Sequence, residues 1–133
     1  MWDGYNAFYG RHGDTAVAAD VSAVTWQRFF DPSEPVHVLL AQSNGNVCGL
    51  AHCILHGSTT QIAPVCYLRD LFTAESARGQ GIGRALIDGV SALARSLGAT
   101  QVYWQTHQSN ATAMRLYDQV AQRAPFVIYG KSL

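Results

Sequence analysis

The sequence predicts a single α/β domain in which helices flank a mixed β-sheet. Apolar runs with strand-like alternation in the middle of the chain give way to segments whose apolar residues recur at helical spacing. The turn Asn44-Gly45-Asn46 joins two of the strand segments as an antiparallel hairpin. Residues 65–106 then read as strand, glycine loop, helix and strand, a unit whose two strands must be parallel. A chain of 133 residues supports one core, so the domain is expected to cover residues 1–133.

The first half of the chain predicts two helices and then three strands. Residues 2–10 place aromatic side chains at helical spacing. The second helix is expected over residues 20–30, with Val21, Val24 and Phe29 on its apolar side, because Asp31-Pro32 ends it. The three strand segments are residues 36–41, 47–56 and 65–73.

The second half predicts two more helices and two more strands. After the glycine loop, Ile82, Leu86, Val90 and Leu93 form one helical stripe that stops at Gly98. The other elements are a strand at 101–106, a helix capped by Ser109 or Asn110 that ends near 122, and a short strand at 126–129. The expected order is therefore α-α-β-β-β-α-β-α-β.

The composition excludes several classes of function. Nine basic and nine acidic side chains cancel, so there is no basic field to hold nucleic acid or an anionic membrane. No apolar run reaches the roughly 20 residues of a membrane span, and the first residues do not resemble a signal peptide. The three cysteines lack metal-ligand spacing and are expected to be reduced and buried. These features predict a cytoplasmic protein.

No metal site is expected. His52 and His56 fall on one face of a strand, but positions i and i+4 of a strand lie roughly 13 Å apart, too far for one ion.

The glycine loop between residues 78 and 84 is the most informative motif. A loop of this kind presents bare main-chain N–H groups at a helix N-terminus, which favours an anion such as a pyrophosphate. A Walker A loop requires a Lys that is absent, and the G-x-G-x-G spacing does not fit a dinucleotide fingerprint. The remaining pattern is Arg78-x-x-Gly81-x-Gly83. A tight strand-to-helix turn without a ligand is the alternative.

In this motif the chain resembles the GCN5-related N-acetyltransferase (GNAT) family, which has an acyl-CoA N-acyltransferase fold and binds acetyl coenzyme A. The resemblance implies that the loop holds the pyrophosphate of the coenzyme, through Arg78, Gly79, Gln80, Gly81, Ile82, Gly83 and Arg84. It also implies that main-chain groups of Leu71, Phe72 and Thr73 pair with the pantetheine arm as if it were an added strand. These three can be core strand residues at the same time.

The second family signature is an Asn followed seven positions later by a Tyr, here Asn110 and Tyr117. Seven residues are about two helical turns, so both side chains project from one face of the helix. The resemblance implies that Tyr117 lies beside the coenzyme sulfur, where a phenol can protonate the departing thiolate. A core tyrosine with a hydrogen-bonded hydroxyl is the alternative.

Asp70 is the best-placed carboxylate to accept the proton of the attacking amine, since it precedes the pantetheine-pairing residues. The segment from Tyr67 resembles the Tyr-Leu-Glu-Asp stretch of diamine and polyamine acetyltransferases, but Arg69 stands where those enzymes have Glu. An Arg cannot accept a proton and repels a polycation, which argues against a spermidine-like acceptor. Asp70 can instead be a structural partner of Arg69 or Arg78, and a water chain can replace a side-chain base.

Taken with the resemblance, the sequence predicts an acetyl-CoA-dependent N-acetyltransferase whose acceptor is a primary amine of a small molecule or peptide. The acceptor pocket is expected from residues 2–35, lined by Trp2, Tyr5, Phe8, Tyr9 and Trp26. Family members usually begin with a strand before the first helix; because this chain opens directly in the helix, the first strand is expected to be missing, truncated or supplied by another subunit. The sheet edge that this leaves open suggests a homodimer. A catalytically silent domain that senses coenzyme A and a ligand-free adaptor domain are the alternatives.

Overall fold

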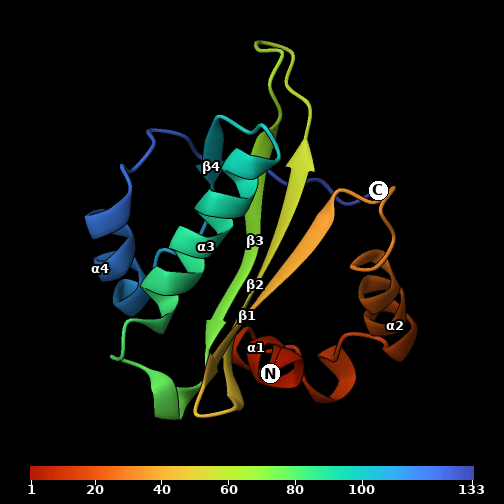
Figure 1. Cartoon of the computed structure of the whole chain (residues 1–133). Helices are drawn as coiled ribbons and strands as arrows, with labels where there is room; N and C mark the ends of the chain where they lie inside the picture. The colour runs from red at the N-terminus through yellow and green to blue at the C-terminus, as the bar shows by residue number, and fades with distance from the viewer.

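The structure, a computed structural model, describes residues 1–133 as a four-stranded sheet in the order β1-β2-β3-β4 with helices on both faces (Figure 1). The strands are β1 (Val36–Ser43), β2 (Asn46–His56), β3 (Val65–Thr73) and β4 (Gln101–Tyr103). The α-helices are α1 (Trp2–Phe8), α2 (Ala19–Arg28), α3 (Ile82–Ser96) and α4 (Ala111–Val120), with short 3-10 turns at Gly13–Thr15 and Glu75–Ala77. None of the helices has the length and apolar character needed to cross a membrane.

The strand pairing follows from the turns. Asn44 and Gly45 adopt φ angles of +49° and +80°, the left-handed pair that a two-residue hairpin turn requires, and β1 and β2 pair antiparallel. β2 and β3 are also antiparallel, whereas β3 and β4 are parallel and joined through α3. The predicted mixed sheet is confirmed.

The main core lies between the sheet and α3, the helix that Figure 1 shows lying across the sheet with α4 beside it. Ala51 and Cys53 of β2 meet Leu86 and Val90 of α3 there, all buried. α3 approaches β2 so closely that a Cβ on Gly49 would lie 2.8 Å from Ile82 Cγ2. The three cysteines are free and buried, as predicted.

The opposite face of the sheet is covered in part by α1 and α2. Gly4 of α1 lies against the Phe72 ring, and Trp2 bonds through its indole N–H to Ser22 Oγ of α2 at 3.1 Å. The expected apolar side of the second helix is wrong in part, because Val21 and Val24 are exposed. α2 has no buried residue, since it stands beside the sheet edge rather than across it (Figure 1).

β3 and β4 part after three residue pairs, the last being Tyr67 with Tyr103. β3 continues to Thr73 without a neighbour on that side, so its main-chain groups there are free for an added strand. The predicted strand at 101–106 is accordingly shorter in the structure, which gives β4 as Gln101–Tyr103.

The predicted strand at residues 126–129 is wrong. Phe126, Val127, Ile128 and Tyr129 lie in an irregular C-terminal segment and are 67–92% exposed. A short apolar run forms a strand only when a neighbour supplies hydrogen bonds, and this segment does not reach the edge of β4.

Candidate active site

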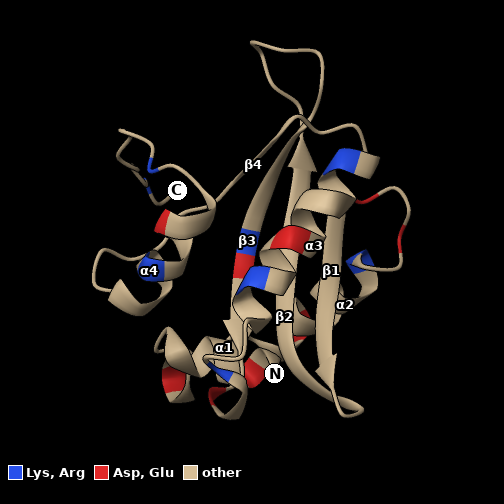
Figure 2. Cartoon of the chain, turned by 60° about the vertical axis from the view of Figure 1, so that its left-hand side comes forward, with Lys and Arg blue, Asp and Glu red and all other residues tan.

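Arg69 and Asp70 are the only Asp, Glu, Lys or Arg residues in the four strands, and Figure 2 shows them as a blue and red pair on β3. They sit at a β-bulge: Leu68 pairs with Cys53 and Asp70 pairs with His52, so Arg69 is the extra residue. Without the bulge, alternation would place Asp70 on the same face as the core residue Leu68. The bulge turns the carboxylate to the opposite face, toward α1.

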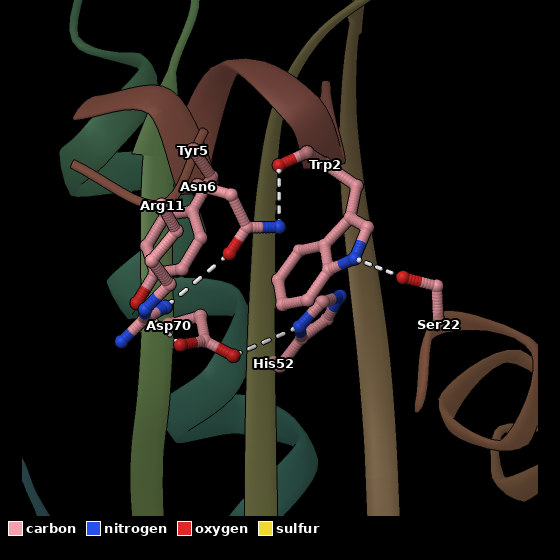
Figure 3. A network of polar contacts seen from close by, with 7 residues as sticks. All are labelled: Trp2, Tyr5, Asn6, Arg11, Ser22, His52 and Asp70. Atoms are coloured by element: carbon pink, nitrogen blue, oxygen red, sulfur yellow. Dashed lines mark hydrogen bonds and ion pairs between the residues drawn. The ribbon is translucent and has the colours of Figure 1, made fainter. Parts of the chain in front are cut away.

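On that face three buried side chains from three elements meet (Figure 3). The Tyr5 hydroxyl of α1 donates to Asp70 Oδ1, and His52 Nδ1 of β2 lies 3.0 Å from Asp70 Oδ2. Side chains at Asp70 and His52 are only about one tenth exposed. Each carboxylate oxygen therefore already has a partner in the protein, and burial leaves little of either oxygen accessible to a substrate.

The surroundings keep Asp70 ionised. Burial alone would raise its pKa, but the hydrogen bonds from His52 and Tyr5 outweigh that cost and hold the pKa below its ordinary value. The positive charge of Arg69 acts in the same direction. Burial and the bond to Asp70 raise the pKa of Tyr5, so the phenol remains a donor. With Asp70 ionised, His52 presents Nδ1–H to it and leaves Nε2 unprotonated when the ring is neutral.

His52 also lines a pocket of about 140 Å³ on this face, bounded by α2 and strands β1 to β3. Nε2 has no hydrogen-bond partner in the protein, and since every fully buried polar side-chain atom has one, part of the Nε2 surface is exposed. The pair therefore keeps one ring nitrogen unbonded in a side chain that lines the pocket, while its carboxylate stays in the interior.

Aromatic rings fix the imidazole. Trp2 stacks on Tyr5 at 5.4 Å and lies 5.2 Å from the His52 ring, and Phe29 of α2 lies 4.9 Å from it. Three residues from the range 2–35 line the pocket: Thr25, Arg28 and Phe29. None of the five aromatic residues predicted to line the acceptor pocket is among them, and Trp26 is 61% exposed.

The glycine loop carries main-chain donors that the protein does not use. None of the N–H groups from Gly79 to Arg84 donates to a protein acceptor, and Gly81, the N-cap of α3, supplies no side-chain cap. Gly79 and Gly81 have φ angles of +75° and +81°, and a Cβ on either would enter open space. Donors without partners, at the positive end of a 15-residue helix, suit a polyanion.

The charged side chains of this loop differ in their partners. Arg84 donates to Gln119 Oε1 of α4 at 2.7 Å, whereas Arg78 is exposed and makes no ion pair. Gln80 folds back onto the carbonyl of Ser76 at 3.1 Å. Arg78 is thus the cation left free beside the unpaired N–H groups.

The end of β3, the start of α3 and α4 converge. A Cβ on Gly83 would lie 3.1 Å from Leu116 of α4 and 3.9 Å from the Thr73 hydroxyl. Leu71 and Phe72 precede Thr73 along the strand edge that β4 leaves free, and Asp70 is three residues, about 10 Å, from Thr73.

Asn110 and Tyr117 lie where the helix pattern predicts. Asn110 caps α4, its Oδ1 accepting from the N–H of Ala113 at 3.3 Å. Tyr117 packs against Trp104, 5.4 Å between ring centres, but its hydroxyl makes no hydrogen bond to the protein. Burial raises the pKa of Tyr117 to about 12, with a further contribution from Tyr9. A core tyrosine with a bonded hydroxyl is therefore not what the structure contains.

Sequence reasoning missed the role of His52. It weighed His52 only as a metal ligand with His56, yet His52 turns to Asp70 and His56 bonds Tyr103 at 3.0 Å. A signal was present: His52 is a polar residue inside a run that is otherwise small and apolar, so it needs a buried partner.

Comparison with known proteins identifies the family. Residues 2–121 match the Acetyltransferase (GNAT) family. The chain is 34% identical over 134 aligned positions to D-amino-acid N-acetyltransferase HPA3 of Saccharomyces cerevisiae, covering 99% of this chain and 81% of that protein.

Solved structures share the fold at lower identity. An integron cassette protein from Vibrio cholerae has a TM-score of 0.77 at 23% identity, covering 98% of this chain and 80% of that one. The aminoglycoside acetyltransferase AAC(6')-Iy, in complex with a coenzyme A bisubstrate analogue, has a TM-score of 0.78 at 16% identity, covering 89% and 82%. The family match spans nearly the whole chain and includes both motifs, and so the protein belongs to the GNAT family of N-acetyltransferases.

Proposed function

We propose that this N-acetyltransferase moves the acetyl group of acetyl-CoA to the primary amine of a small molecule, with the Asp70–His52 dyad as proton acceptor and Tyr117 as proton donor. The observation that carries the proposal is the ionised carboxylate bonded to His52 Nδ1, while Nε2 makes no bond to the protein and the imidazole lines a pocket.

The coenzyme fits two features of the chain. The unpaired N–H groups from Gly79 to Arg84, with Arg78 beside them, would hold the pyrophosphate. The free edge of β3 at Leu71, Phe72 and Thr73 would pair with the amide groups of pantetheine. The coenzyme supplies an activated acyl group as a thioester, and Asn110 fixes the start of the helix that carries Tyr117.

Acetyl transfer needs a neutral amine, a polarised carbonyl and a stabilised thiolate. His52 Nε2 accepts the proton that the ammonium group must lose, and Asp70 stabilises the resulting imidazolium. A main-chain N–H near Phe72 polarises the carbonyl as the new C–N bond forms. After the C–N bond forms, the nitrogen loses a second proton to His52, whose first proton has passed to solvent. The Tyr117 hydroxyl donates its proton to the sulfur as the C–S bond breaks and regains one from solvent. An ammonium group and acetyl-CoA therefore give the amide, the coenzyme A thiol and one proton released to solvent.

The pocket favours a small acceptor. At about 140 Å³ it is smaller than the roughly 300–1,000 Å³ of sites for drug-sized ligands, so it takes one end of an amine rather than a protein segment. The yeast relative named as a D-amino-acid N-acetyltransferase supports a small-molecule acceptor. No observation favours the silent or adaptor alternatives.

The test is turnover. Purified protein with acetyl-CoA and a panel of amino acids, amino sugars and polyamines is expected to release coenzyme A thiol and give a product 42 Da heavier, the mass of one acetyl group in place of a hydrogen. The panel includes peptides as the competing acceptor class. If the protein binds acetyl-CoA but acetylates no amine in the panel, it would be a catalytically silent domain that senses coenzyme A.

Replacing Tyr117 with phenylalanine is expected to lower kcat by about 10–100-fold, because the thiolate loses its proposed proton donor. With a pKa of about 12 the phenol stays protonated at neutral pH, so the loss should be similar from pH 6 to 9. Assays of coenzyme A thiol release, run at each pH from 6 to 9, measure kcat. An unchanged kcat at every pH would show that Tyr117 only packs against Trp104.

We also propose a cytoplasmic homodimer. Three free cysteines support a reducing compartment. The exposed apolar segment 126–129 and the uncovered edge of β4 support association with a second copy. Light scattering coupled to size exclusion should give twice the 14.4 kDa chain mass, and Phe126→Glu with Ile128→Glu should shift it to the monomer. A monomeric wild-type chain at micromolar concentration would contradict the dimer.

A further inference from the structure

The pocket at His52 has an unusual charge. Two guanidinium groups line it, Arg28 at the end of α2 and Arg69 at the β3 bulge, and no Asp or Glu is among the lining residues. Phe29 and Ile54 form its apolar walls. Arginine side chains on the wall of a small pocket that also holds a proton acceptor make poor neighbours for a polycationic amine.

Arg69 has no carboxylate partner. The bulge places it next to Asp70, but Tyr5 and His52 occupy both oxygens of that carboxylate, and Arg69 makes no ion pair. Its guanidinium lies over the Tyr67 ring, 6.0 Å from the ring centre. A stacked guanidinium keeps its N–H edge available for a planar anion.

Arg28 is only partly compensated. Its Nε lies 3.4 Å from Glu34 Oε1, which leaves the two terminal nitrogens free, and its side chain is half exposed. Glu34 lies outside the pocket lining. Among the residues that line the pocket with His52, Arg69 therefore makes no ion pair and Arg28 is paired through Nε alone.

We propose that the acceptor is an α-amino acid whose carboxylate is held by Arg69, with Arg28 in support, while its amine faces His52. This inference about the substrate class rests on the proposed function. Guanidinium and carboxylate match as a planar two-bond pair. In an α-amino acid one carbon separates the amine from the carboxylate, so the proton acceptor and the arginines must share one small pocket, as they do here.

The test compares each amino acid with its amide, which lacks the carboxylate. Wild-type kcat/KM is measured by thiol release for D- and L-alanine, D- and L-phenylalanine, and the corresponding amino-acid amides, which keep the amine and lose the negative charge. The preferred amino acid is expected to exceed its amide by about 100-fold, the effect of one to two charge-assisted hydrogen bonds.

Arg69→Gln should lower kcat/KM for the amino acid about 10–100-fold more than for its amide, chiefly through KM. Arg69→Lys should fall between, because it keeps the charge and loses the planar fork. Arg123→Gln is the matched control and should behave as wild type. Arg123 is an exposed arginine that follows α4 and pairs with Asp118 of that helix. Acetyl-CoA affinity, measured by calorimetry, should be the same in all four proteins.

The outcomes separate this inference from the proposed function. Amides or polyamines turned over as well as amino acids, or an Arg69→Gln loss that is equal for acid and amide, would overturn the carboxylate site and leave an acetyltransferase. A folded protein that acetylates no amine would overturn both. The site would be established if the protein acetylates amino acids and if only the Arg69 variants raise KM, and only for amino acids rather than their amides.

Discussion

Replacing Asp70 with asparagine is expected to lower kcat by about 10²–10⁴-fold, the range of a lost proton acceptor. Asparagine fills the same space and can still accept from Tyr5, but its amide N–H would face His52 Nδ1 at the position of a 3.0 Å contact. His52 would then carry its proton on Nε2 and could not accept another from the amine. Thiol-release kinetics with saturating acetyl-CoA measure kcat directly.

Two histidine variants locate the proton acceptor. His52→Gln should lose about as much kcat as Asp70→Asn, because the two residues act as a unit. His56→Gln is the matched control: it lies on the same strand and the same face, but bonds Tyr103 instead of a carboxylate. If His52→Gln kept wild-type kcat while Asp70→Asn lost it, Asp70 would act on the amine without His52.

The same carboxylate should also make stability depend on pH. Its pKa is below the ordinary value in the folded protein, so the stabilisation is complete above that ordinary value, about 3.9, and is lost as pH falls through the folded-state pKa. Asp70→Asn should therefore lose stability at pH 7 and show a weaker decline toward acid than wild type. Denaturant unfolding from pH 7 to pH 3 compares the two slopes.

Replacing Gly81 with alanine is expected to weaken acetyl-CoA binding by about 10–100-fold, equivalent to one or two charge-assisted hydrogen bonds. The new Cβ would enter open space beside the unpaired N–H groups, where the phosphates are proposed to lie. The φ of +81° also costs an L-residue about 1–2 kcal/mol of stability. Calorimetric titration with acetyl-CoA measures the affinity, and thermal unfolding measures the loss of stability caused by the backbone strain.

Gly98 at the other end of α3 supplies the control. It has a φ of +83° and open space around its Cβ position, so Gly98→Ala carries similar backbone strain. It lies near the C-terminal end of the helix, where the macrodipole repels an anion. Equal losses of affinity in the two variants would mean that strain alone weakens binding and that the loop does not contact the phosphates.

Much of the fold follows from local sequence signals. β3 spans residues 65–73 as predicted, the hairpin turns at Asn44-Gly45, and α3 begins directly after Gly81. Each of these depends on neighbours in the chain: alternation, residues that tolerate positive φ, and an apolar stripe of period 3.6. The predicted strand at 126–129 failed because a strand depends on a partner that is not local.

The sequence by itself determined the glycine loop, its exposed donors and the Asn110–Tyr117 spacing, because these are properties of one loop and one helix. Only the tertiary structure decided what Asp70 does. A single extra residue, Arg69, in the β2–β3 ladder reverses the face on which Asp70 lies and brings it to Tyr5 and His52, which are 65 and 18 positions away. Register between strands is a balance of non-local contacts, so one sequence read alone does not reveal where the ladder slips.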